Sequence, residues 1–103
     1  SELSGLLVMD FLIPANSTKI IKESNAPFSQ ILFVQGWAGD AFGSYVLSGY
    51  GSGTSARNHV SSIGDGGIAV ITVDGMEFIV KNTYTSELYC SVLCVMGRAP
   101  VIM

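Results

Sequence analysis

Two groups of side chains in this sequence are of the kinds that can hold a sugar. Sugar binding needs an exposed aromatic ring that packs on a pyranose face, and a few polar groups that hydrogen-bond its hydroxyls. The candidates lie around Trp37 and from Tyr50 onward, and they are Trp37, Asp40, Tyr50, Arg57, Asn58 and His59. Trp37 equally suits a second role, in which it packs under a neighbouring subunit.

Residue types used in catalysis are present, but the sequence does not arrange them into a known site. A nucleophilic triad needs a positioned histidine between a carboxylate and an exposed serine, whereas His59 lies in a polar segment. Glycoside hydrolysis needs two carboxylates at a set separation, and nothing places two of the candidates at that distance. These candidates are Asp40, Asp65, Asp74, Glu77 and Glu87. We expect no enzyme activity.

The closely spaced glycines Gly49, Gly51 and Gly53 superficially resemble a phosphate-binding loop. No Lys-Ser or Lys-Thr pair follows them and no helix is expected to begin there, so the helix dipole of such a loop is missing. We expect a turning surface loop.

Cys90 and Cys94 are the only cysteines. On one strand their Cα atoms would lie roughly 13 Å apart at ~3.3 Å per residue, about twice the span of a disulfide. A metal site would need further cysteine or histidine ligands. We expect two reduced core thiols, no metal and no cofactor, which fits assembly in a reducing cytosol.

Composition excludes several partners. Only 13% of the 103 residues are charged and 49% are apolar, which points towards assembly. With a net charge of -3 and five fixed cations, no basic stripe exists to bind nucleic acid. The longest apolar runs, 6–13 and 92–96, are shorter than the ~20 residues of a membrane helix, so we expect no membrane insertion.

The periodicity predicts an all-β chain. Runs rich in β-branched and aromatic residues are bounded by glycine, proline, asparagine and aspartate. The expected strands are 6–13, 18–23, 28–35, 42–48, 68–73, 76–82 and 87–96, with a further short strand around 58–63. A wide hairpin is expected over 36–41 with Trp37 near its tip, and 49–66 is expected to be the longest loop. Asp74-Gly75 suits a two-residue type I′ turn.

About seven or eight short antiparallel strands in a single domain, residues 1–103, imply a β-sandwich with Greek-key or jelly-roll connections. A closed barrel is the competing architecture. The final strand is apolar on both faces, and one chain of this size has too few other elements to cover both. We therefore expect a subunit contact on the face that carries Tyr89, Leu93 and Val95.

The segment from Phe78-Ile79-Val80-Lys81-Asn82 through Leu88-Tyr89-Cys90-Ser91-Val92 resembles the C-terminal domains of bacteriophage tail fibres, and 43–51 is similar to their middle strand and glycine-containing loop. This resemblance implies a homotrimeric head at the fibre tip of a virion, assembled in the host cytoplasm. It also implies recognition of a bacterial surface glycan or outer-membrane protein, and a chain that is the C-terminal fragment of a longer fibre protein.

Our leading hypothesis is thus a non-enzymatic receptor-binding head that presents loops between Gly36 and Gly66. The alternatives are a structural trimerisation, capsid or baseplate module without a ligand, a stand-alone lectin-like domain, and a small hydrolase or lyase.

Overall fold

The computed structural model of the chain describes residues 7–22, 28–51, 56–63, 69–75 and 77–103. Within these ranges every regular element is a β-strand, which confirms the predicted all-β class. The strands are β1 Leu7–Ile13, β2 Thr18–Lys22, β3 Phe28–Ala38, β4 Ala41–Gly51, β5 Ala56–Ser62, β6 Ala69–Asp74, β7 Glu77–Asn82, β8 Leu88–Met96 and β9 Val101–Ile102. The described residues contain no helix that is long and apolar enough to cross a membrane.

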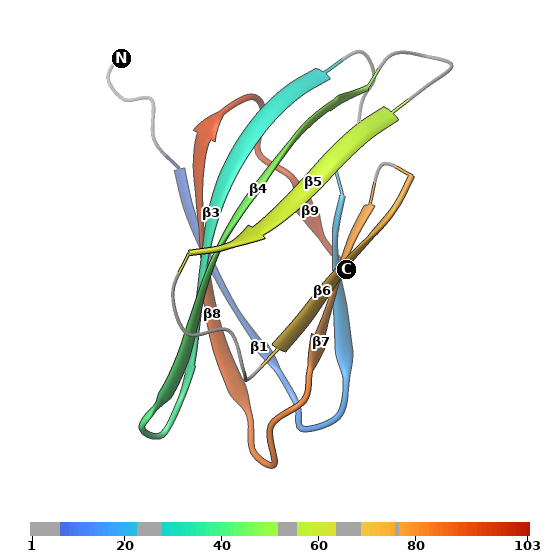
Figure 1. Cartoon of the computed structure of the whole chain (residues 1–103). Coiled ribbons are helices and arrows are strands. Elements are labelled where there is room, and N and C mark those ends of the chain that lie inside the picture. Colours follow the sequence, from blue (N-terminus) through green and yellow to red (C-terminus); the bar gives the residue numbers. More distant parts are fainter. Residues whose placement is uncertain (1–6, 23–27, 52–55, 64–68, 76) are drawn as a thin grey trace.

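The strands form two antiparallel sheets that pack face to face (Figure 1). The larger sheet has the order β1-β8-β3-β4-β5 and the smaller one the order β6-β7-β2-β9. Strand β8 returns from the end of the chain to lie between β1 and β3, as in Greek-key connections. Because the described strands hydrogen-bond within two separate sheets, the predicted sandwich is confirmed over the closed barrel.

The core lies between the two sheets and follows from strict alternation along the strands. In β3 the side chains of Leu32 and Val34 are buried, while those of Ile31 and Phe33 lie on the outer side. The smaller sheet contributes the fully buried ring of Phe78 to the same cluster. One face of each of these strands is thus used for the core.

The side chain of Asn82 is fully buried and joins three segments of the chain. Its Nδ2 donates to the carbonyl oxygens of Ile13 at 3.0 Å, Pro14 at 3.2 Å and Ser86 at 2.9 Å. Its Oδ1 accepts the Tyr84 N–H at 2.8 Å. The asparagine therefore fixes the β7–β8 turn against the end of β1.

The β3–β4 hairpin is tight, so the expected wide hairpin over 36–41 is wrong. Ala38 pairs with Ala41, which leaves only Gly39 and Asp40 in the turn. Gly39 has a φ of 58°, a left-handed conformation that glycine adopts without steric cost. Trp37 is consequently a strand residue that lies opposite Phe42.

The long loop expected over 49–66 is also wrong. Gly49 and Gly51 belong to β4, and β5 occupies Ala56–Ser62, which confirms and lengthens the short strand expected around 58–63. A Cβ at Gly49 would come within 2.4 Å of the Arg57 carbonyl oxygen. Close strand pairing, not a phosphate loop, explains this glycine; Gly53 lies outside the described residues.

The hairpin predicted around Asp74-Gly75 is confirmed, with the turn placed one residue later. Asp74 still pairs with Glu77 as the last residue of β6, and Gly75 carries the positive φ of 61°. Glu77 in turn lies 3.5 Å from the Lys22 ammonium group across the outer side of the smaller sheet. Asp74 is thus the last residue of β6 and not part of the turn. Asp65, another of the carboxylate candidates, lies outside the described ranges.

The end of β8 departs from alternation because the pairing with β3 shifts register between Ile31 and Leu32. A β-bulge of this kind inserts an extra residue and redirects the side chains around it. Val95 and Met96 are therefore both exposed, whereas strict alternation would put Met96 on the same buried face as Cys94. The strand β9, which pairs with β2, was not predicted.

Candidate functional site

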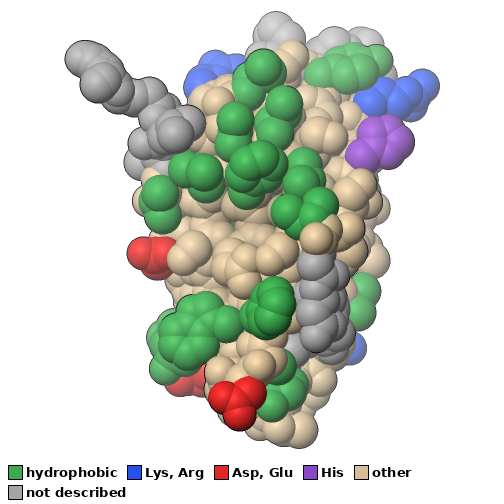
Figure 2. Space-filling model, turned by 60° about the vertical axis from the view of Figure 1, so that its left-hand side comes forward, with side chains coloured by type: hydrophobic (Ala, Val, Ile, Leu, Met, Phe, Trp, Pro, Cys, Tyr) green, Lys and Arg blue, Asp and Glu red, His purple; other side chains and the backbone are tan. Residues whose placement is uncertain are grey.

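The outer face of the five-stranded sheet carries side chains in rows that run across the strands. Antiparallel partners point to the same side of a sheet, so the strand registers define each row. The aromatic row consists of Leu12, Tyr89, Trp37 and Phe42; the polar row of Asp10, Ser91, Gln35 and Ser44; the apolar row of Val8, Leu93, Phe33 and Val46. Figure 2 shows this face with hydrophobic side chains in two groups and a band of other side chains between them.

The aromatic row contains a stacked ring pair. The ring centroids of Trp37 and Tyr89 are 4.6 Å apart and their planes differ by 19°. The two residues are direct partners in the β3–β8 ladder, and aromatic pairs across strands stabilise a sheet. Even so, 48% of Trp37 and 42% of Tyr89 remain exposed.

The polar row is held by hydrogen bonds across neighbouring strands. The Ser91 hydroxyl donates to Asp10 Oδ1 at 2.5 Å, between β8 and β1. The Ser44 hydroxyl donates to Gln35 Oε1, between β4 and β3. These bonds fix the orientation of the Asp10 carboxylate and of the Gln35 amide between the aromatic and the apolar rows.

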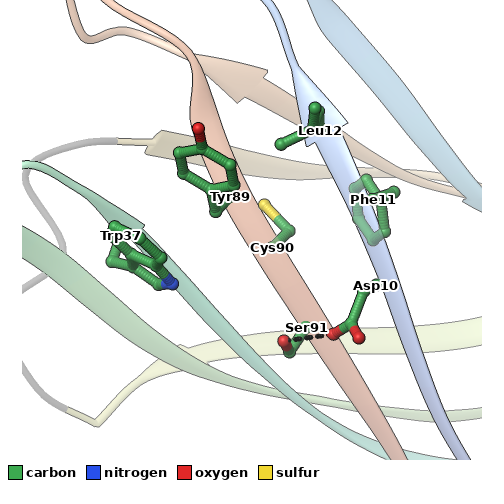
Figure 3. A pocket seen from close by; sticks show the side chains of 7 residues that line it. All are labelled: Asp10, Phe11, Leu12, Trp37, Tyr89, Cys90 and Ser91. Carbon is green, nitrogen blue, oxygen red and sulfur yellow. Dashed lines mark hydrogen bonds between the residues drawn. The ribbon is translucent and has the colours of Figure 1, made fainter.

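A depression of about 320 Å³ lies where the aromatic and polar rows meet. Its described lining residues are Asp10, Phe11, Leu12, Trp37, Tyr89, Cys90 and Ser91. Figure 3 shows the Trp37 and Tyr89 side chains on β3 and β8, with the Ser91–Asp10 hydrogen bond joining β8 to β1. The site thus combines a stacked aromatic surface with a fixed carboxylate.

A second depression, of about 420 Å³, lies on the other side of the polar row. Val8, Phe33, Ile63 and Leu93 supply most of its apolar lining, and Gln35 and Ser91 belong to its polar edge. It is therefore more apolar than the first, and it lies over the apolar row.

The structure does not bring the six predicted binding residues together. Trp37 and Asp40 lie at the β3–β4 hairpin. Tyr50 pairs with Arg57 at the other end of the same sheet, roughly 26 Å from Phe42 along β4 at ~3.3 Å per residue. His59 is exposed near Tyr50 on β5. Of the six, only Asp40 lies in a turn.

Asn58 is half-buried, and its side chain hydrogen-bonds within the chain. Its Nδ2 donates to the Gly75 carbonyl oxygen at 2.9 Å, and its Oδ1 accepts from Gln30 Nε2 at 3.5 Å. These contacts connect β5 to β3 and to the β6–β7 turn. The structure therefore explains Asn58 as a link between sheets.

The three predicted interface residues lie on or beside the outer face. Tyr89 belongs to the aromatic row, Leu93 to the apolar row, and Val95 is exposed at the β8 bulge. Leu93 is half-buried and Val95 is exposed, so this chain alone leaves the second face of β8 partly open.

Sequence reasoning missed Asp10 and Ser91, which line the depression beside Trp37. Both occupy outward positions on their strands, so alternation marks them as surface residues. Their proximity to Trp37 depends on β8 lying between β1 and β3. The only signal in the sequence was that each is a polar residue inside an apolar run, and such a residue alone does not indicate a binding site.

The two cysteines are buried thiols, as predicted. Burial raises the pKa of the Cys90 thiol from 9.0 to about 12, so the group is protonated and unreactive at neutral pH. Cys94 Sγ lies 3.4 Å from the Gly97 carbonyl oxygen in the turn after β8. Among the described residues, no three histidine, cysteine, aspartate or glutamate side chains form a group that could hold a metal ion.

No protein-family model and no curated protein matches the sequence. Among solved structures, the fold is similar to part of the tailspike protein gp49 of the Acinetobacter baumannii bacteriophage Fri1, a capsular polysaccharide depolymerase. The TM-score is 0.66 at 9% sequence identity, over 95% of this chain and 18% of the tailspike chain. This chain spans less than a fifth of the tailspike's length, and the likeness at this identity shows the fold alone.

Proposed function

We propose that the chain is a non-enzymatic receptor-binding head of a phage tail fibre, which recognises a glycan or outer-membrane protein on the bacterial surface. The observation that carries the proposal is the exposed Trp37–Tyr89 stack beside a fixed carboxylate. The sandwich shared with part of a phage tailspike supports the tail-associated setting. Recognition then involves the outer face of the five-stranded sheet, in addition to the adjoining turns.

The chemistry of the 320 Å³ depression supports binding without turnover. Glycosidases generally use two carboxyl groups on either side of the scissile bond. Asp10 is the only carboxylate among the described lining residues of this depression, and Glu77 is paired with Lys22 on the other sheet. The depolymerase activity belongs to the whole tailspike, of which the matched part is 18%.

The same outer face supports self-association. Leu93 lines the second depression together with Val8 and Phe33, and Val8, Phe33 and Val95 are exposed in the single chain. Large apolar surfaces of this kind usually mark protein contacts. We propose that three copies associate through this region in the virion. Should no ligand exist, the same apolar row favours the alternative of a structural trimerisation module.

Binding and turnover can be measured together on an array of bacterial surface polysaccharides and on whole bacterial cells. We expect the intact chain to bind at least one polysaccharide or cell type and to release no oligosaccharide from it. Failure to bind any polysaccharide or cell would remove the receptor-binding proposal. Release of oligosaccharide products would replace it with the hydrolase or lyase alternative.

Self-association is expected to depend on Val95. The chain should sediment as a trimer at micromolar concentration, and Val95→Asp should weaken the association at least tenfold because it places a charge in an apolar contact. Val70→Asp is the matched control, since Val70 is an exposed valine on the smaller sheet and its partner Lys81 tolerates a carboxylate. A stable monomer of the unaltered chain would contradict the assembly proposal.

A further inference from the structure

We propose that the 320 Å³ depression between β1, β8 and β3 is a carbohydrate subsite that takes a neutral or amino-substituted pyranose and disfavours acidic sugars. The inference rests on the proposed receptor-binding function and assigns it a place and a ligand class. It also moves the binding site from the end loops to the face of a sheet.

The aromatic pair supplies the surface on which a sugar ring can pack. Trp37 and Tyr89 stack on each other, so each ring is held in one orientation while nearly half of its area stays accessible. Leu12 extends the apolar surface on the β1 side of the depression. A rigid, half-exposed aromatic surface suits the C–H face of a pyranose, because little side-chain freedom is lost on binding.

The Asp10–Ser91 pair supplies the polar end of the subsite. The Ser91 hydroxyl donates a hydrogen bond to Asp10 Oδ1, which leaves Asp10 Oδ2 and the lone pairs of Ser91 as acceptors. An ionised carboxylate accepts hydrogen bonds and donates none. Ligand groups that donate, namely hydroxyl, amide N–H and ammonium groups, therefore match this end of the depression.

Charge then separates the sugar classes. None of the described residues that line the depression is Lys, Arg or His, and the chain carries a net charge of -3. A uronic or sialic acid carboxylate would meet the Asp10 carboxylate with no cation among the described lining residues, which costs binding energy. An amino sugar would gain a charge-assisted hydrogen bond at the same position.

The dimensions fit a single residue of a glycan. The depression lies at the lower end of the range of roughly 300–1,000 Å³ that is typical of small-molecule sites, and it is open towards solvent on the outer face. A glycan chain can therefore continue along the polar row.

The test compares binding to neutral, amino-substituted and uronic acid-containing glycans on one array, using the intact chain and single variants. Trp37→Ala and Asp10→Asn should each weaken binding at least tenfold, and Trp37→Phe should restore part of it. Tyr50→Ala probes the second group of sugar-binding candidates that the sequence suggested. Asp74→Asn and Val70→Ala are the controls, since both remove exposed groups of β6, away from the depression. They should change affinity less than twofold, and thermal unfolding should show that all variants fold.

The outcomes separate the two proposals. Glycan binding that survives Trp37→Ala and Asp10→Asn, or that is lost in Tyr50→Ala instead, would overturn the subsite and leave the receptor-binding function in place. A preference for acidic glycans, or cell binding with no glycan bound, would also overturn the subsite. Absence of any glycan or cell binding would remove both.

Discussion

Replacing Asn82 with aspartate should lower the free energy of unfolding by about 3 kcal/mol or more at neutral pH, because a buried donor is exchanged for a buried charge. The amide Nδ2 donates to the carbonyl oxygens of Ile13, Pro14 and Ser86. An ionised carboxylate in its place would have no hydrogen to donate and would face three oxygen acceptors. The Tyr84 N–H is the only partner that it could keep.

The Asn82→Asp variant should also acquire a characteristic pH dependence. Burial against carbonyl oxygens raises the pKa of the introduced carboxyl group above its unfolded value of about 4. Its protonated form can donate, so the loss of stability should be smallest below about pH 4 and should grow as the pH rises through the raised pKa.

Urea unfolding of Asn82→Asp at several pH values measures both effects. Asn16→Asp is the control, because Asn16 is exposed with a φ of 60° and aspartate tolerates this conformation. It should cost less than about 0.5 kcal/mol. Equal losses in the two variants, or a loss in Asn82→Asp that does not vary with pH, would contradict the role of Asn82 as a buried donor.

Gly49→Ala should destabilise the fold by about 2–3 kcal/mol, as expected when a side chain is forced into a filled space. The new Cβ would meet Asn58 Oδ1 at 1.9 Å and the Arg57 carbonyl oxygen at 2.4 Å. The side chain of Asn58 can rotate away, but only by breaking its bonds to Gln30 and Gly75. The backbone carbonyl can move only with strand β5.

Gly39→Ala is the matched control for this substitution. Its φ of 58° costs an L-residue roughly 1–2 kcal/mol, but the added Cβ would meet no atom within 4 Å apart from its own chain neighbours. Chemical denaturation should therefore rank Gly49→Ala as the more damaging change. A neutral effect of Gly49→Ala would mean that Gly49 lies in a free loop, as the glycine-rich composition first indicated, and not in the β4–β5 ladder.

Local patterns predicted most of the architecture. Alternation in 28–35 and 88–94 correctly divided the side chains between two faces, and the Asp74-Gly75 pair marked a real hairpin. Errors arose where local chemistry was ambiguous. Gly36, Gly49 and Gly51 were assigned to turns or loops, but the structure places all three in strands. At Gly49 the strand needs a glycine because β5 approaches its backbone closely. The β8 bulge is set by pairing with β3 and leaves no local sequence signal.

The candidate site was predictable only in part, for a physical reason. Trp37 was predicted either to bind a sugar or to pack under a neighbouring subunit, and Tyr89 was predicted to lie in a subunit contact, but nothing in the sequence paired the two. Their stacking depends on β8 lying beside β3, and Asp10 joins them because β1 lies on the other side of β8. Such long-range pairing is a property of the topology, so a list of residue types could not have joined these three side chains.

The fluorescence of Trp37 provides the most direct test of the account, because it is the single tryptophan of the chain and lies in the proposed subsite. The neutral or amino-substituted glycan that binds best on the array is titrated into the unaltered chain, and binding is followed in parallel by calorimetry. We predict a saturable change in Trp37 emission with the same midpoint as the calorimetric curve. Calorimetric binding that leaves the emission unchanged would show that the sugar sits elsewhere and would contradict the central claim.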